Sequence, residues 1–587
     1  MRKSKVQSIF KINVILIAFL FASTLVISQN KADQIDDLIS KYTEYGKFNG
    51  SALVARDGKI IFKKGYGMAN MEWDIPNAPD TKHRLGSITK QFTAMLILQL
   101  ANEGKIDLNK PVNAYLPDYS EVNGDKITTH HLLTHTAGIP NYTAFPRFFQ
   151  DESRNPYTPD EFVEKFADST LEFTPGEKFS YSNSGYFLLG VLVEKITAKS
   201  YEDVLQEKIF IPIGMNNSGF DHHDEIMKNR ATGYEKNGNS YVNSAYLDMS
   251  IPYAAGSLYS TTEDLLLWDQ ALYTDTLLPK KYMDLYFKPQ IPAFGNSHYA
   301  YGWGVGKSQI GKSKDSVATI GHGGGINGFN TLITRMPTDR TLVVLLNNTG
   351  GAPLNSITKA ISGILYDKPY DMPKQSVANS LLSIIRQKGL ESGLAHYNTI
   401  KDSEGYALSE NEMNNTGYEL LQSGKVDEAT AVFKLIVNAF PKSSNAYDSY
   451  AEGLMTQGKN DLAIVNYKKS VELNPANQNG IDYLRKLGVK EDEIKKDVVV
   501  GDAILETYVG RYQLMPNFVI EVKKNGSTMK AQATGQPEFE IFAKDENVFY
   551  LKVVNAQITF NKGESGSVDS VTLLQGGKEI TGNRIME

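Results

Sequence analysis

The chain has 587 residues, 41% of them hydrophobic and 22% charged, so it can bury several cores and is not a disordered protein. At ~150 residues per domain this length predicts about four structural units, and a net charge of −6 without an internal basic block excludes a typical nucleic-acid-binding protein. The absence of cysteine excludes disulfides, thiolate metal sites, cysteine nucleophiles and lipoprotein acylation.

Residues 1–28 predict a secretory signal peptide. Four basic residues precede an apolar run over 14–27, and the small residue Ser28 ends the run. The run is too short to span a ~30 Å hydrocarbon core comfortably. We expect cleavage near Ser28 and export to the periplasm or the cell exterior, with no membrane span after cleavage. An uncleaved N-terminal anchor is the alternative.

Residues 29–371 predict a domain with both helices and strands. Residues 50–56 and 59–64 are rich in β-formers and flank Asp57-Gly58, which is typical of a hairpin. Three further elements are predicted: a helix over 88–101 that stops near Gly104, a strand over 341–346 and a helix over 356–366. Together they indicate an α+β fold in which helices flank an antiparallel sheet.

Residues 372–496 predict a helical segment with an internal repeat. Four pairs of equivalent residues are separated by 34 positions: Gly424 and Gly458, Ala429 and Ala463, Phe433 and Tyr467, Pro441 and Pro475. This period resembles the tetratricopeptide repeat (TPR), and residues 389–397 resemble a degenerate earlier copy. A spacer and a surface for a protein partner are both open as roles.

Residues 497–587 predict a small all-β domain. Short strand patterns over 519–522, 549–554 and 570–574 are separated by Gly and Asn-Gly turns, which favours a β-barrel or sandwich. No residue pattern in this segment indicates chemistry.

Two glycine-rich motifs match nucleotide-binding patterns but lie in the wrong context. Residues 306–313 satisfy the phosphate-loop pattern, and residues 323–328 satisfy a dinucleotide fingerprint. Both functions require the motif to open a helix, whose amides bind the phosphates. Here the following segments, 316–320 and 330–335, predict strands, so we reject both motifs and expect no cofactor.

A metal site is also not expected. His131 and His135 have the spacing of one helical turn, which could hold zinc, but no third ligand is evident. We interpret the pair as histidines at a helix end.

The motif that indicates chemistry is Ser87-Ile-Thr-Lys90. Its spacing places a hydroxyl and an amine on one face of a helix, and a neutral lysine there can accept the serine proton if burial lowers its pKa from ~10.4. The spacing alone is weak evidence. It recurs at Ser8, Ser28, Ser356 and Ser527, where it predicts an ordinary helix face.

Outside the predicted signal peptide, only Ser87 precedes both Tyr181-Ser-Asn183 and His322-Gly-Gly324 at domain-scale distances. With these motifs the chain resembles the serine β-lactamase and D-Ala-D-Ala carboxypeptidase superfamily, closest to its class C and esterase branch. The resemblance covers about residues 33–370. It rests on the stretches His83–Ala94, Leu132–Gly138, Pro175–Ser184 and Gly321–Gly325.

The resemblance implies a role for each matching residue. Ser87 would be the acylated nucleophile, Lys90 its proton acceptor and Tyr181 a proton relay. Asn183 would orient Lys90 and the substrate. The remaining implied substrate-binding residues are His322, Gly323, Gly324 and Gly325. The backbone amides of Ser87 and Gly325 would form the oxyanion hole.

One departure from the family pattern concerns the substrate. The β-lactamase branch usually has Lys-Thr-Gly where this chain has His322-Gly-Gly, and a histidine is mostly neutral at pH 7. We therefore expect weak β-lactam turnover and a preference for esters or amides of D-amino-acid peptides, cell-wall peptides included. Glu177 does not match the deacylating glutamate of class A enzymes and is interpreted as a surface residue.

Two features and two alternative functions stay open at this stage. The aromatic-rich residues 141–157 and Trp303 could line a pocket or only pack in the core. A non-catalytic protein could use the same cleft to bind peptidoglycan or a partner, although binding alone would not need a positioned proton acceptor. Scaffolding through the helical repeats is the third hypothesis.

Overall fold

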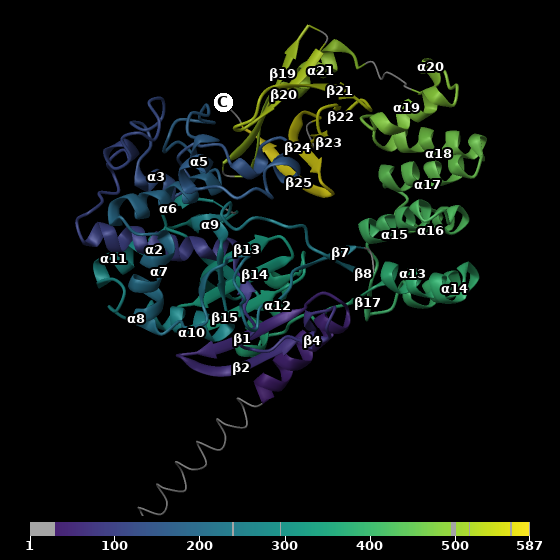
Figure 1. Ribbon diagram of the computed structural model, residues 1–587. Helices are drawn as coiled ribbons and strands as arrows, with labels where there is room; N and C mark the ends of the chain where they lie inside the picture. Colours follow the sequence, from purple (N-terminus) through teal and green to yellow (C-terminus); the bar gives the residue numbers. More distant parts are fainter. Residues whose placement is uncertain are drawn as a thin grey trace, which may run out of the picture. The chain divides into compact units, whose positions relative to one another are not determined.

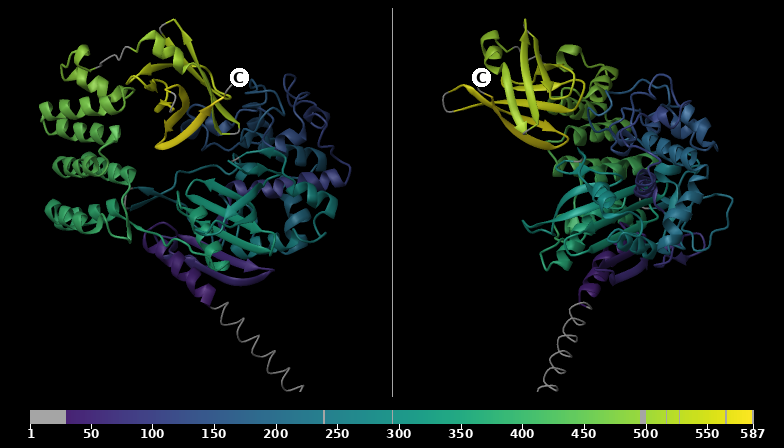
Figure 2. Two further views of the ribbon diagram at one scale, coloured as in Figure 1. Left: turned by 180° about the vertical axis from the view of Figure 1, so that it is seen from behind. Right: turned by 90° about the vertical axis from the view of Figure 1, so that its left-hand side faces the viewer.

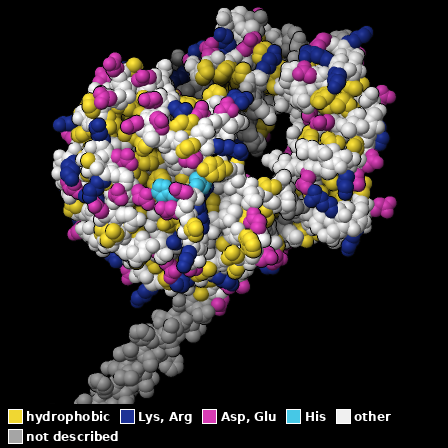
Figure 3. Space-filling model, in the orientation of Figure 1, with side chains coloured by type: hydrophobic (Ala, Val, Ile, Leu, Met, Phe, Trp, Pro, Cys, Tyr) yellow, Lys and Arg dark blue, Asp and Glu magenta, His cyan; other side chains and the backbone are white. Residues whose placement is uncertain are grey.

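The computed structural model describes residues 30–237, 240–293, 295–494, 500–515, 517–526, 528–563 and 566–585 (Figure 1). The predicted signal peptide lies outside these residues. The chain divides into two compact units, and the boundary between them in the sequence falls between Lys374 and Gln375. Among the helices of the described ranges, none is long and apolar enough to cross a membrane. Acidic and basic side chains are interspersed over the face in Figure 3.

An eight-stranded antiparallel sheet forms the centre of the N-terminal unit, in the order β10-β11-β12-β13-β14-β15-β1-β2. Its strands are β1 (Gly50–Arg56), β2 (Lys59–Tyr66), β10 (Ile291–Pro292), β11 (His298–Tyr299), β12 (Gly304–Gln309), β13 (Ser316–Ile326), β14 (Phe329–Met336) and β15 (Thr341–Asn347). The predicted hairpin and the predicted strand over 341–346 are confirmed. β1 pairs with β15 in the register Gly50 to Asn347, so strands from both ends of the unit lie side by side.

Helices cover both faces of this sheet because alternate residues of its central strands are apolar on both sides. Val343 and Leu345 pack with a helix over residues 30–44 and with α12 (Leu354–Leu365). Leu342 and Val344 belong to the larger core on the opposite face. That core contains α2 (Thr89–Asn102), α6 (Asn183–Thr197), α9 (Tyr253–Gly256), α10 (Thr262–Ala271) and α11 (Lys280–Phe287).

Helix α2 is the buried helix that the sequence predicts over 88–101. Every residue from Thr89 to Ala101 is buried. A 3₁₀ turn, η1 (Gly86–Ile88), precedes it and carries Ser87. Gly104 follows the helix with φ +71°, a left-handed conformation that suits the glycine predicted as the stop.

The two rejected nucleotide motifs lie in the sheet. Residues 306–313 cover the end of β12 and the turn into β13, and residues 323–328 cover the end of β13 and the turn into β14. Neither segment opens a helix, so the contextual argument against both motifs is confirmed.

The C-terminal unit begins with antiparallel helices packed side by side (Figure 2). They are α13 (Val377–Lys388), α14 (Leu390–Ile400), α15 (Glu410–Gln422), α16 (Val426–Ala439), α17 (Ser444–Thr456), α18 (Asn460–Leu473) and α19 (Gln478–Lys486). Residues 34 positions apart occupy equivalent places: Gly424 and Gly458 both have φ +77°, and Ala429 and Ala463 are both fully buried. The TPR assignment stays a prediction.

A closed eight-stranded barrel ends the chain. Its strands are β18 (Gly510–Met515), β19 (Phe518–Asn525), β20 (Thr528–Ala533), β21 (Phe539–Ala543), β22 (Val548–Leu551), β23 (Ala556–Lys562), β24 (Val568–Gln575) and β25 (Lys578–Arg584). A barrel was one of the two predicted forms. The strand predicted over 549–554 is too long, because the chain bends after Leu551. Tyr508 of α21 (Asp502–Tyr508) stacks on Phe560 at 4.2 Å in the core.

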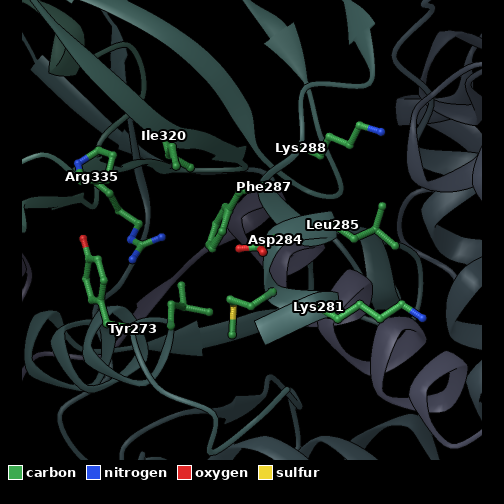
Figure 4. Close-up of a pocket in the computed structure, with 11 residues that line it drawn as sticks. Tyr273, Lys281, Asp284, Leu285, Phe287, Lys288, Ile320 and Arg335 are labelled. Carbon is green, nitrogen blue, oxygen red and sulfur yellow. The ribbon is translucent and has the colours of Figure 1, made fainter. Parts of the chain in front are cut away.

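A buried ion pair joins α10 to the sheet. Arg335 of β14 donates from Nε to Oδ1 of Asp269 at 2.6 Å, and both side chains are at most 2% exposed. The guanidinium carbon lies 4.6 Å from the ring centroid of Tyr273 and 4.9 Å from that of Phe287, beside a cavity of about 690 Å³ (Figure 4). Burial raises the pKa of Asp269, and Arg335 opposes this rise.

We predict that Asp269→Ala lowers the free energy of unfolding of the N-terminal unit by about 3–5 kcal/mol, because it leaves the Arg335 charge buried without its partner. Urea unfolding followed by tryptophan fluorescence measures this, since Trp73, Trp268 and Trp303 all lie in that unit.

The control is Asp284→Ala. Asp284 pairs with Lys280 at the surface, with 65% of its side chain exposed, so its loss is expected to leave the unfolding midpoint unchanged. Equal midpoints for the two variants would contradict the importance of the buried pair.

Candidate active site

Ser87 lies where η1 meets strand β13. Gly86 has φ +55°, and a Cβ built on it would lie 2.9 Å from the backbone nitrogen of Gly325. Only glycine therefore lets this turn approach the strand without strain. Ser87 occupies the 3₁₀ turn just before α2. The segment leads directly into α2, which carries Lys90.

The amine of Lys90 is fully buried and has three hydrogen-bond partners. Nζ lies 3.0 Å from Ser87 Oγ, 2.8 Å from Asn183 Oδ1 and 2.8 Å from the carbonyl oxygen of Ala255. Burial lowers the pKa of Lys90 well below its ordinary value. The geometry thus joins the predicted nucleophile, the predicted proton acceptor and the predicted orienting amide.

The orientation of the Asn183 amide follows from its neighbours. Asn141 Oδ1 accepts from the backbone N–H of Asn183 at 3.1 Å and faces the Asn183 side-chain nitrogen at 3.3 Å. Since an amide nitrogen only donates, Nδ2 of Asn183 points to Asn141 and Oδ1 points to Lys90. Asn141 is a supporting residue that the sequence did not single out.

Tyr181 lies over the amine of Lys90. Its ring centroid is 4.9 Å from Nζ. Burial raises the pKa of Tyr181, and a hydrogen bond to Ser87 partly opposes the rise. A phenol in this environment keeps its proton at neutral pH, so it can donate that proton but is a poor base.

His135 supports Tyr181. Its ring centroid lies 4.2 Å from that of Tyr181, and its Nδ1 accepts from the backbone N–H of Ser182 at 3.2 Å. Both histidines are predicted to lie at a helix end. His131 lies in the last turn of α3 (Thr129–Leu133), but His135 lies beyond the helix with φ +56°, so the two do not share a helix face. His131 instead accepts from the backbone of Thr128.

Among the described residues, no group of three or more His, Asp or Glu side chains could hold a metal ion.

His322 lies on β13 opposite Tyr181. Its Nδ1 is 2.6 Å from the carbonyl oxygen of Gly323, which can only accept, so this nitrogen carries the ring proton. Nε2 then accepts from the hydroxyl of Tyr299 at 3.0 Å. Burial and the neighbouring Lys90 lower the pKa of His322 to about 4. The ring is therefore neutral at pH 7. Tyr299 had no sequence signal.

The glycines of β13 allow the strand to approach Ser87. A Cβ on Gly324 would lie 1.8 Å from the carbonyl oxygen of Leu85. Ser87 and Gly325 line one cavity of about 140 Å³ with Asn183. Ser87 and Gly323 line a second cavity, of about 540 Å³, with Tyr181 and His322. The structure thus places every predicted site residue around Ser87.

The other copies of the Ser-x-x-Lys and Tyr-x-Asn spacings lie away from Ser87. Ser356 and Lys359 are exposed on α12, and the amine of Lys359 donates to the side chain of Gln309. Tyr241-Val-Asn243 repeats the Tyr-x-Asn spacing of Tyr181-Ser-Asn183 and lies on a separate short strand, β8 (Ser240–Asn243). Ser8, Ser28 and Ser527 fall outside the described residues. Glu177 is exposed in a turn, and Trp303 is fully buried in the core, so neither lines the site.

Comparison with known proteins gives relatives for the N-terminal unit. The beta-lactamase family model matches residues 35–362, and a model described as a domain of unknown function, DUF3471, matches residues 496–584. Penicillin-binding protein 4* of Bacillus subtilis (strain 168) is 30% identical over 365 residues, which cover 59% of this chain and 79% of that protein.

Two solved structures show the same fold. The octameric penicillin-binding protein homologue from Pyrococcus abyssi has a TM-score of 0.51 at 22% identity, over 94% of this chain and 99% of its own. The D-amino acid amidase from Ochrobactrum anthropi SV3 complexed with L-phenylalanine amide has a TM-score of 0.51 at 24% identity, over 58% of this chain and 99% of its own. The family match extends over more than half of the chain, so the resemblance seen in the motifs is confirmed, and the chain belongs to the beta-lactamase family of serine hydrolases.

Proposed function

We propose that this protein is a hydrolase that forms an acyl-enzyme at Ser87 and cleaves an ester or an amide. One observation carries the proposal: the amine of Lys90 is buried, hydrogen-bonded to Ser87 Oγ, and has no carboxylate partner among the described residues. Burial of this kind favours the neutral form of the lysine, which is a base rather than a cation.

The neutral amine has two N–H groups and one lone pair. Asn183 Oδ1 and the Ala255 carbonyl can only accept, so they take the two N–H groups. The lone pair then faces Ser87 and accepts its hydroxyl proton. Ser87 Oγ attacks the substrate carbonyl as this proton moves to Nζ, and Lys90 becomes an ammonium.

The backbone amides of Ser87 and Gly325 are the proposed oxyanion hole, since both residues line the same cavity. Tyr181 keeps its proton and donates it to the leaving group as the bond to the carbonyl carbon breaks. The ammonium of Lys90 restores the proton of Tyr181. Water then attacks the ester at Ser87, and its proton passes through Tyr181 to Lys90. Lys90 returns a proton to Ser87 Oγ as the ester bond breaks, which releases the acid and the free serine.

The surroundings of Ser87 favour a substrate without a carboxylate at the position of His322. Neither cavity beside Ser87 has Lys, Arg, Asp or Glu among its described lining residues, and His322 is neutral. Esters and amides of D-amino-acid peptides and simple carboxylic esters fit these surroundings. The relative from Bacillus subtilis is named for binding penicillin, so slow reaction with β-lactams is part of the proposal.

With p-nitrophenyl acetate we expect a burst of p-nitrophenol and a protein that gains the mass of one acetyl group. Ser87→Ala is expected to abolish both. Ser356→Ala is the matched control, because Ser356-Ile-Thr-Lys359 repeats the tetrapeptide on an exposed helix. A folded protein without an adduct would instead favour the alternative function, a non-catalytic protein that binds peptidoglycan or a partner.

The acylation rate is expected to rise with pH around a midpoint well below 10.5, since only the neutral form of Lys90 accepts the proton. In Asn183→Asp a carboxylate would face Nζ and stabilise the ammonium, which raises the pKa of Lys90. The midpoint then moves up by about 1–3 pH units and the rate at pH 7 falls. Stopped-flow burst rates between pH 5 and 10 measure this. Asn243→Asp, at an exposed position of the Tyr241-Val-Asn243 copy, should leave the profile unchanged.

His322→Lys would supply the cation that the β-lactamase branch usually has. We expect kcat/KM for nitrocefin to rise about tenfold or more relative to p-nitrophenyl acetate, the size of one charge-assisted hydrogen bond to the β-lactam carboxylate. His322→Gln keeps a neutral side chain and is the control. An unchanged nitrocefin ratio in His322→Lys would show that the missing cation does not limit β-lactam turnover.

A further inference from the structure

The smaller cavity beside Ser87 has buried apolar side chains along part of its wall. Tyr142, Phe148, Leu247 and Ile251 line it, and each is at most 6% exposed. The hydroxyl of Tyr142 donates to the carbonyl oxygen of Ile251 at 3.1 Å, which joins two of the wall segments. The aromatic-rich loop singled out in the sequence therefore both packs in the core and faces Ser87.

Phe149 and Ile326 add apolar surface to this lining, which also contains the polar residues Thr143, Asn183 and Asn327. Phe149 is 53% exposed and packs edge-on against Phe148, with ring centroids 5.2 Å apart. A large aromatic side chain at an exposed position keeps much apolar surface in water. A substrate group that fills the pocket would cover part of this surface.

The two cavities beside Ser87 separate the two halves of a substrate. Tyr181, the proposed donor to the leaving group, lines the larger cavity together with His322 and does not line the smaller one. The leaving group therefore belongs in the larger cavity. The acyl group, which stays bonded to Ser87, belongs in the smaller one with Asn183.

We propose that the smaller cavity binds the acyl side chain of the substrate and selects an uncharged, apolar group about the size of one benzene ring. This inference rests on the proposed function. The cavity volume of about 140 Å³ is close to the ~150 Å³ of an apolar protein cavity that binds benzene. A phenyl group or an alkyl chain of about four to six carbons fits, and a longer chain meets the buried walls.

A series of p-nitrophenyl esters with one leaving group and different acyl chains tests the proposal in the full-length protein. We expect kcat/KM to rise about fourfold per methylene from acetate to butyrate, as expected for burial of apolar surface, and to fall for decanoate. Thr143→Phe places a ring in the pocket and should lower the ratio of kcat/KM for butyrate to kcat/KM for acetate about tenfold. Phe149→Ala removes an exposed ring from the pocket lining. It should therefore raise the ratio of kcat/KM for decanoate to kcat/KM for butyrate.

Trp73→Ala is the control, because Trp73 is an aromatic residue that is 80% exposed and does not line the pocket. This variant should leave the dependence of kcat/KM on acyl length unchanged. If all esters acylate Ser87 at rates that depend neither on acyl length nor on Thr143→Phe, the acyl-pocket proposal is wrong and the proposed function stands. If no ester acylates Ser87, both proposals fall.

Discussion

The removal of one lysine amine from water is the constraint on which the site depends. An isolated ammonium in a protein interior is costly in free energy, so burial of a lysine without a carboxylate partner lowers the pKa of its amine. Lys90 is in this position, with one hydroxyl, one amide oxygen and one carbonyl oxygen as neighbours. None of these groups is charged, and two of them can only accept. The same contacts fix the direction of the lone pair in the neutral amine, and burial favours that neutral form.

The fold supports this arrangement by bringing a helix end against a strand. Gly86 and Gly324 occupy positions where a Cβ would meet backbone atoms of the opposite segment, at 2.9 Å and 1.8 Å. Thr331 of β14 adds a hydrogen bond from its hydroxyl to the carbonyl oxygen of Leu85 at 2.7 Å. The serine segment and the strand are thus held at a separation that larger residues would not permit. The position of Ser87 relative to the strand amides is a property of this packing and not of the tetrapeptide itself.

Local spacing in the sequence was enough to predict the contact between Ser87 and Lys90, because residues three apart share a helix face. Hairpins, the buried helix and the barrel strands followed from the same kind of local pattern. The carbonyl of Ala255 and the hydroxyl of Tyr299 could not be predicted, since a backbone oxygen leaves no trace in sequence and tyrosine is common in this chain. His135 was noted in the sequence, but its contact with Tyr181 was not predicted. Its spacing from His131 suggested that both lie in one helix, and that helix ends before His135. The strand after Phe549 was predicted too long because Val553 and Val554 are β-formers in an exposed bend.

The neutrality of Lys90 also bears on the choice of substrate. A carboxylate brought close to the amine would stabilise the ammonium and remove the base that the reaction needs. A cation at the position of His322 would bind such a carboxylate but would also lie near Lys90, where like charge further lowers the pKa of the amine. The chain has neither group: His322 is neutral and its two ring nitrogens are already hydrogen-bonded. An uncharged substrate leaves the proton equilibrium of Lys90 undisturbed. The absence of charged residues from the described walls of both cavities is therefore consistent with the proposed use of a neutral lysine as base.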